Sequence, residues 1–135
     1  MRWKVEDIEK YEQAKEYIDT AVIPVFSFDP NLLGIEVVLE QTWLEEVCVY
    51  AERQLTGRVV LFPTLYLFNN EPSFCNINFT TFSHHLFVTT NQEIAEQLEK
   101  AHFNVYLLAR QDKEEELALM VREGKKLSQY IMENW

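Results

Sequence analysis

Several polar residues follow directly after continuous apolar runs, at positions where a folded chain could carry chemistry. In an open parallel sheet, ligands bind beyond the carboxyl ends of the strands, because the fold brings those ends together. Hydroxyls, an amide and charged groups at such ends could hold a phosphate- or carboxylate-bearing ligand. The polar and turn residues at these ends are Ser27, Asp29, Pro63, Thr64, Thr89, Thr90, Asn91 and Arg110. The candidate ligand-binding set is Ser27, Asp29, Thr89, Thr90, Asn91 and Arg110.

Each of these positions also has a purely structural interpretation. Thr90 and Glu93 have the spacing of a capping box, so we favour a helix cap over an anion site at the start of this helix. Asp29 lies two residues after Ser27, and the two could form an acid–base pair. An Asp before a Pro is more often an ordinary turn residue, and we favour that interpretation of Asp29.

No motif in the chain supports a stronger chemical assignment. The glycine-rich patterns G-x-G-x-x-G and G-x-x-x-x-G-K-[ST] are absent, which argues against dinucleotide and P-loop binding. Cys48 and Cys75 form no CxxC pair, and Cys48 falls on the buried face of a predicted helix. His84 and His85 would point to opposite faces of a strand. We therefore expect no metal and no cofactor, and we assign no catalytic residue.

The charge balance restricts the partners of the chain. Its 135 residues include 12 basic and 22 acidic side chains, a net charge of -10 at pH 7. Such a charge repels a phosphate backbone, so we expect no nucleic-acid partner. The start of the chain lacks the pattern of a signal peptide. The longest apolar run, Val59–Phe68, is broken by Pro63 and is shorter than the about 20 residues that span a bilayer. We expect a cytoplasmic protein with no transmembrane segment.

Two kinds of segment alternate along the chain. Apolar residues recur at helical spacing in Val5–Ile18, in a stretch that begins at Ile35 or as late as Trp43 and ends at Leu55, in Thr90–Ala101 and in Asp112–Trp135. Continuous apolar runs, typical of strands buried on both faces, occupy Thr20–Phe28, Arg58–Phe62, His85–Thr89 and Asn104–Ala109. We expect Asn69–His84 to be a loop that includes at most one helical turn.

This alternation predicts a single three-layer α/β domain over residues 1–135. The sheet should be mostly parallel, with four strands or slightly more and helices on both faces, as in Rossmann or flavodoxin-like folds. Pro24 removes one ladder donor from the first strand, which suggests an edge strand or a bulge. Gly57 follows the last apolar residue of the second helix and should end it.

Three stretches of the chain carry a resemblance to a known family. They are Arg2-Trp3 followed by Asp7-Ile8, the run from Ala14 to Pro24, and the run from Gly57 to Pro63. Together they resemble the YpiF-like family of small uncharacterised proteins from Bacillus-type bacteria. The resemblance implies a bacterial protein and covers most of the chain. It brings no established activity and no catalytic residues.

The absence of a catalytic set favours a non-enzymatic role. We expect a protein-interaction or assembly domain, with a protein partner or a second copy bound through helical faces or through Trp3 and Trp135 near the termini. The alternative is a ligand-binding protein or enzyme that uses the strand ends described above, which is supported by fold geometry alone.

Overall fold

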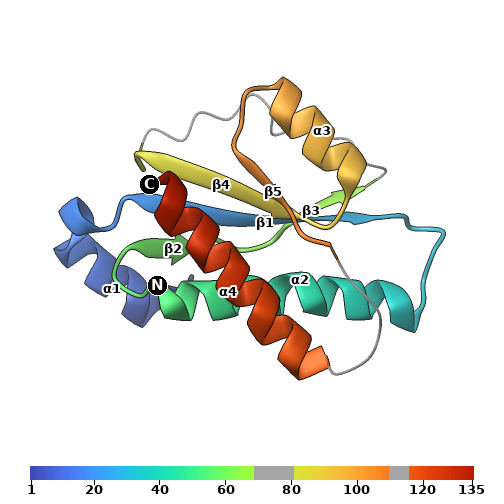
Figure 1. Ribbon diagram of the computed structural model, residues 1–135, viewed down its shortest axis with the longest axis horizontal. Helices are drawn as coiled ribbons and strands as arrows, with labels where there is room; N and C mark the ends of the chain where they lie inside the picture. The colour runs from blue at the N-terminus through green and yellow to red at the C-terminus, as the bar shows by residue number, and fades with distance from the viewer. Residues whose placement is uncertain (69–80, 110–115) are drawn as a thin grey trace.

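The computed structural model describes residues 1–68, 81–109 and 116–135, and its elements alternate between helices and strands (Figure 1). The helices are α1 (Val5–Gln13), a short 3-10 turn (Lys15–Tyr17), α2 (Ile35–Gln54), α3 (Gln92–Lys100) and α4 (Glu116–Asn134). The strands are β1 (Thr20–Phe28), β2 (Val59–Leu61), β3 (Leu65–Phe68), β4 (His84–Thr89) and β5 (Val105–Leu107). Among the described residues, no helix has the length and apolar character required to cross a bilayer.

All strand pairs among the described residues are parallel, in agreement with the mostly parallel sheet that the sequence predicts. The order is β2-β1-β4-β5, and β3 pairs with the far end of β1 on the same side as β2. If β2 and β3 are taken as one interrupted edge strand, the order is 2-1-3-4. These are the first four positions of the flavodoxin-like order, in which ligands bind where the order reverses. That reversal point here lies between β1 and β4.

Helices cover both faces of the sheet, which gives three layers. In β1, Val22 and Phe26 face the core under α2 and α4, whereas Ile23 and Val25 face the core under α1 and α3. The alternation follows from the two-residue period of a strand, and it explains why the whole run is apolar. Figure 1 shows α4 crossing α2 on one side of the sheet. The predicted three-layer α/β architecture is confirmed.

Pro24 lies in the middle of the sheet, so the prediction of an edge strand is wrong. Its side of β1 faces β2 and β3, because Thr20 N–H bonds Arg58 O and Phe62 N–H bonds Val22 O on that side. The register there changes from Val22↔Leu61 to Val25↔Leu65, three residues on β1 against four on its neighbour. One extra residue is the definition of a bulge, and the missing donor of Pro24 lies at it. We call this feature the β2–β3 bulge.

Several element boundaries differ from those predicted. The first helix ends at Gln13, because a 3-10 turn replaces its last part. The second helix already begins at Ile35, so Thr42 is inside the helix rather than at its N-terminal cap. Strand β3 was not predicted as a separate strand. The stretch 112–115 and most of the loop predicted at Asn69–His84 lie outside the described residues. The second helix ends at Gln54 with Leu55 as its C-cap, and Gly57, with a φ of 92°, lies in the turn that follows.

Candidate functional site

The strand ends at the reversal point lie at two different levels along the sheet. Strand β4 ends at Thr89, which pairs with Val25, whereas β1 continues alongside β3 as far as Phe28. Asp29 follows four residues after Val25, which at about 3.3 Å per residue is about 13 Å further along. The structure therefore brings Thr89, Thr90 and Asn91 together, and separates them from Asp29 because the two strands differ in length.

Within the Thr89–Asn91 turn, polar side chains accept hydrogen bonds from backbone N–H groups at the start of α3. Asn91 is the N-cap, and its Oδ1 accepts a hydrogen bond of 3.0 Å from the Ile94 N–H. The buried Thr89 hydroxyl accepts a bond of 3.2 Å from the Asn91 N–H. The prediction that Thr90 caps this helix is wrong by one residue, since Asn91 occupies the cap position.

In the turn after β1, the Asp29 carboxylate likewise accepts a hydrogen bond from the backbone of its own turn. Asp29 Oδ1 accepts a bond of 2.9 Å from the Asn31 N–H, and the Asp29 carbonyl accepts one of 3.0 Å from the Leu32 N–H. This is an Asx turn, the geometry that favours Asp before a chain reversal. Ser27 is half-buried in the last part of β1. Arg110 lies outside the described residues.

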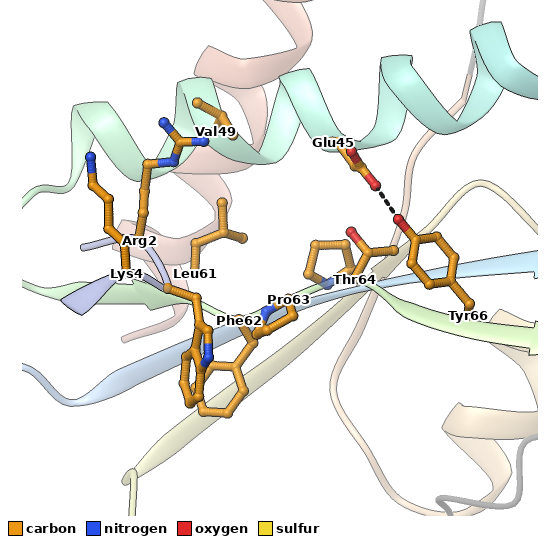
Figure 2. Close-up of a pocket in the computed structure, with 11 residues that line it drawn as sticks. Arg2, Lys4, Glu45, Val49, Leu61, Phe62, Pro63, Thr64 and Tyr66 are labelled. Carbon is orange, nitrogen blue, oxygen red and sulfur yellow. Dashed lines mark hydrogen bonds between the residues drawn. The ribbon is translucent and has the colours of Figure 1, made fainter. Parts of the chain in front are cut away.

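A pocket of about 560 Å³ lies at the sheet edge, beside the β2–β3 bulge (Figure 2). It opens between α2 and the chain that passes from β2 into β3, and Pro24 of the central strand contributes to its lining. Its volume is within the range of small-molecule sites in proteins. The lining residues are Arg2, Trp3, Lys4, Pro24, Glu45, Val49, Leu61, Phe62, Pro63, Thr64 and Tyr66.

One wall of the pocket comes from the N-terminal segment. Arg2 forms a parallel bridge with Leu61, which fixes this segment against the outer edge of β2. The Arg2 N–H donates to Asp7 Oδ2 at 2.9 Å, a hydrogen bond that lowers the pKa of the Asp7 carboxyl. Trp3 follows, with its ring centroid 4.8 Å from that of Phe62. Figure 2 shows the Arg2 and Lys4 side chains on the same side of the pocket.

The opposite wall of the pocket carries the Tyr66 hydroxyl, which is hydrogen-bonded to the Glu45 carboxylate. The Tyr66 hydroxyl donates to Glu45 Oε1 at 2.8 Å and accepts from Gln41 Nε2 at 3.0 Å (Figure 2). Gln41 also donates to Glu45 Oε1 at 3.3 Å, from one turn earlier on α2. Partial burial, followed by the bond to Glu45 and its charge, raises the pKa of the Tyr66 hydroxyl. This hydroxyl therefore stays protonated at neutral pH, and it satisfies one carboxylate oxygen of Glu45.

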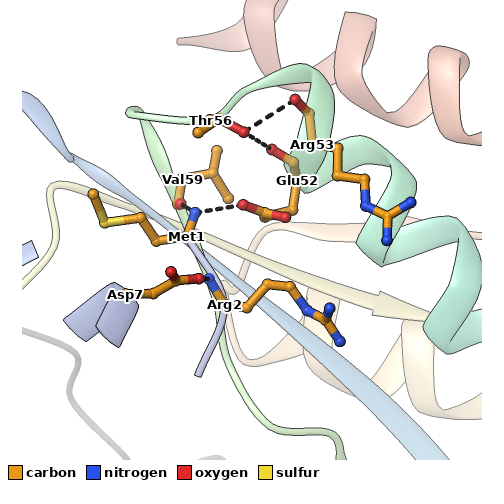
Figure 3. A network of polar contacts seen from close by, with 7 residues as sticks. All are labelled: Met1, Arg2, Asp7, Glu52, Arg53, Thr56 and Val59. Carbon is orange, nitrogen blue, oxygen red and sulfur yellow. Dashed lines mark hydrogen bonds and ion pairs between the residues drawn. The ribbon is translucent and has the colours of Figure 1, made fainter. Parts of the chain in front are cut away.

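A second polar cluster lies at the start of β2 (Figure 3). The Met1 ammonium group is 2.6 Å from the buried Glu52 carboxylate of α2, and it also donates to the Val59 carbonyl. The Leu61 N–H donates to the Met1 carbonyl at 2.6 Å. These contacts hold the first residue against β2 and thereby place Arg2 and Trp3 at the pocket.

Histidines and cysteines do not form a reactive centre in the described part of the chain. The His84 ring stacks on Trp135 at 5.2 Å between centroids, and His102 follows α3 with a φ of 68°. Cys48 is buried, and burial raises the pKa of its thiol far above the ordinary value. Cys75 lies outside the described residues. Within residues 1–68, 81–109 and 116–135, no three His, Cys, Asp or Glu side chains converge as metal ligands would.

A further surface consists of large apolar side chains that precede and begin α2. We call it the α2 stripe, and its members are Leu32, Leu33, Ile35, Val38 and Leu39. Their exposed fractions run from 36% for Leu39 to 95% for Leu33. The second half of the same helix buries Trp43, Leu44 and Val47 under α4 and the sheet. The helix therefore extends beyond the core it covers.

Sequence reasoning found only part of these surfaces. It placed Pro63 and Thr64 at a strand end, and both line the pocket. Arg2 and Lys4 were missed, because nothing local indicates that the N-terminal segment docks beside β2. Glu52 could have been found, since it lies one turn after Cys48 on a helical face that is otherwise apolar.

Comparison with known proteins supports the resemblance noted above. The chain is 40% identical over 72 residues to the uncharacterized protein YpiF of Bacillus subtilis (strain 168), a match that covers 53% of this chain and 49% of that protein. The match thus spans about half the length of this curated relative. No solved structure matches the chain. The family profile described as "Protein of unknown function (DUF2487)" matches residues 9–135. The chain belongs to this family, DUF2487.

Proposed function

We propose that this protein is a non-enzymatic interaction domain that binds a protein partner through the α2 stripe. The observation that carries the proposal is the exposure of five large apolar side chains within eight residues of sequence, namely Leu32, Leu33, Ile35, Val38 and Leu39. Single exposed apolar residues are ordinary, whereas several gathered in so short a segment are typical of an interaction site. Ile35, Val38 and Leu39 have the i, i+3, i+4 spacing with which helices pack against a partner helix.

The charge around the stripe favours a basic partner over a second copy of the chain. Glu36 and Glu40 lie on the same turns of α2, and the whole chain carries a net charge of -10. Two copies packed through this face would bring like charges together, which costs free energy. A segment with apolar anchors flanked by Lys or Arg would be attracted instead. The proposed partner is therefore a basic amphipathic helix.

Ligand chemistry at the strand ends has less support. The Thr89 hydroxyl, the Asn91 amide and the Asp29 carboxylate all hold backbone N–H groups of their own turns. The cytoplasmic location expected from the sequence remains part of this proposal, as does the absence of a nucleic-acid partner.

The test uses a synthetic helical peptide with leucines at one face and lysines elsewhere, and a second peptide with glutamates in place of the lysines. Fluorescence anisotropy measures binding of each peptide to the full chain. We expect the lysine peptide to bind and the glutamate peptide not to bind. The variant Ile35→Ser/Val38→Ser leaves the charge unchanged and should weaken binding by at least about ten-fold.

Met132→Ser provides the matched control, because it removes an exposed apolar side chain from α4. It should leave the affinity for the lysine peptide unchanged. Equal weakening by both variants, or no binding of the lysine peptide, would overturn the proposal. Sedimentation that shows a dimer of the wild type lost in Ile35→Ser/Val38→Ser would also overturn it, since the occupant would then be a second copy.

A further inference from the structure

The pocket beside the β2–β3 bulge lies outside the proposed interaction surface and has a chemistry of its own. We infer that it binds a small acidic ligand, with a phosphate or carboxylate head held by Arg2 and Lys4 and an apolar, ring-sized body that covers the exposed part of the Trp3 ring. The pocket contacts the middle turns of α2 at Glu45 and Val49. The α2 stripe ends before these turns, so the two sites can be tested separately.

The first argument is the charge of the pocket. Arg2 and Lys4 are both exposed, and neither makes an ion pair among the residues that the structure describes. The Asp7 carboxylate accepts a hydrogen bond from the Arg2 backbone N–H, and the positive charge of Lys4 acts on it as well. Because the bond to Arg2 is made by the backbone, the Arg2 guanidinium is not used by it. Both cations line the pocket, so this side of it is positive although the whole chain carries a net charge of -10. A guanidinium matches the paired oxygens of a carboxylate or phosphate.

Glu45 lines the same pocket, but its negative charge does not remove the preference of the pocket for an anionic head group. Its Oε1 accepts from the Tyr66 hydroxyl at 2.8 Å and from Gln41 Nε2 at 3.3 Å, so this oxygen is already paired. Figure 2 places Glu45 and Tyr66 on the far side of the pocket from Arg2 and Lys4. The head group should therefore bind at the cationic side. The Tyr66–Glu45 side is left for a neutral polar group of the ligand.

The pocket also has an apolar lining. Leu61, Phe62 and Pro63 contribute to it from the chain after β2 and Val49 from α2, and the Trp3 ring leans on Phe62 at an interplanar angle of 45°. Trp3 is 56% exposed, which leaves ring surface for a ligand to cover. A ligand ring would therefore cover Trp3 while its charged head reaches Arg2.

The experiment follows the three tryptophan indole N–H signals of the full chain by NMR, with the Trp3 signal assigned from Trp3→Phe. The probes are phenyl phosphate, phenylacetate, inorganic phosphate and benzyl alcohol. We expect phenyl phosphate or phenylacetate to shift the Trp3 signal more strongly than the buried Trp43 signal. The stronger of the two identifies the head group. Inorganic phosphate and benzyl alcohol, which each lack one half of the ligand, should bind at least about ten-fold more weakly.

The variant Arg2→Gln/Lys4→Gln tests the cationic wall. It should weaken binding of the better probe by at least about ten-fold, which is a loss of about 1.4 kcal/mol. The Arg2 backbone, which bridges Leu61, is unchanged in this variant, and the remaining amide signals verify the fold. Lys10→Gln removes a nearby positive charge outside the pocket and should have no effect. Unchanged binding in the double variant, equal binding of benzyl alcohol, or an unmoved Trp3 signal would overturn the inference.

Discussion

At the scale of single residues, the Met1–Glu52 pair shows how one buried charge can fix a chain segment. The Glu52 side chain is only 5% exposed, and the Met1 side chain beside it is 13% exposed. A buried carboxylate without a partner is costly, whereas a paired one is tolerated. The pair thus links the last turn of α2 to the edge of β2, and it holds Arg2 and Trp3 where the pocket needs them.

Glu52→Gln should lower the free energy of unfolding by about 1–3 kcal/mol, because the Met1 ammonium loses its counter-charge while it stays largely buried. Urea denaturation of the chain with Met1 as its first residue measures this loss. Glu46→Gln removes an exposed carboxylate from the same helix and should change stability by less than about 0.5 kcal/mol. Equal losses of unfolding free energy in both variants would show that the buried Met1–Glu52 pair contributes no more to stability than an exposed carboxylate.

The Tyr66 hydroxyl should make stability depend on alkaline pH. Its pKa is raised in the folded protein, whereas in the unfolded chain it ionises near the ordinary value of 10.0. The unfolded state therefore loses this proton first, and the stability contributed below pH 10 declines as the pH rises through the folded pKa. Tyr66→Phe removes this effect, so the stability difference between wild type and variant should narrow above pH 10.

Denaturation at a series of pH values from neutral to above 10 measures this difference. Tyr17→Phe serves as the control, since it also removes one phenol from the unfolded chain. In the folded protein Tyr17 is 72% exposed, so its removal should not change how stability depends on pH. A constant gap between wild type and Tyr66→Phe across the whole series would contradict the prediction.

At the scale of elements, the crossing of α2 and α4 depends on a glycine. A Cβ on Gly124 would come within 2.9 Å of the Cβ and Cγ of Tyr50, closer than real carbon atoms approach. A glycine in the middle of a helix costs about 1 kcal/mol relative to alanine. Its presence in α4 is explained by the close approach of the two helices, which alanine would force apart.

Gly124→Ala should therefore destabilise the protein by about 1–3 kcal/mol, although alanine is the better helix former. Lys125→Ala changes an exposed neighbour on the same helix and should stay within about 0.5 kcal/mol of wild type. Thermal and urea unfolding of the two variants provide the comparison. A stabilised Gly124→Ala would mean that the helices are further apart than described here.

Elements also show where sequence patterns stop being informative. The buried runs were predictable because each is apolar on both faces, and each of the four overlaps a strand of the observed sheet. Strand β3 has only four residues and follows Pro63, so its pattern cannot be separated from the end of β2. The shift of the cap from Thr90 to Asn91 is of the same kind, since either side chain could accept the backbone bond.

At the scale of the whole molecule, the layers follow from the sequence but the surfaces do not. The alternation of apolar runs and amphipathic helices predicts a covered parallel sheet, and the structure has it. The candidate residues at the strand ends would lie together only if the strands ended at the same level of the sheet. Because β1 extends past the end of β4, Asp29 and Thr89 lie at different levels. Relative strand length is set by pairing partners, which no local pattern reveals.

Whole-molecule packing also separates the two terminal tryptophans. Trp3 leans on Phe62 at the β2 edge, whereas Trp135, which follows α4, stacks on His84 at the start of β4. They do not bring the terminal helices together, since α1 and α4 pack into cores on opposite faces of the sheet. The apolar character of both ends thus serves two unrelated contacts.

The extra residue between β2 and β3 also bears on the behaviour of the protein at high concentration. An open edge strand that is long and straight can template the addition of further chains and start amyloid-like growth. Here the edge is divided into pieces of three and four residues that are out of step by one, and the Met1–Arg2 segment already occupies the first piece. A regular incoming strand could match one piece or the other but not both, which disfavours strand addition at this edge of the sheet.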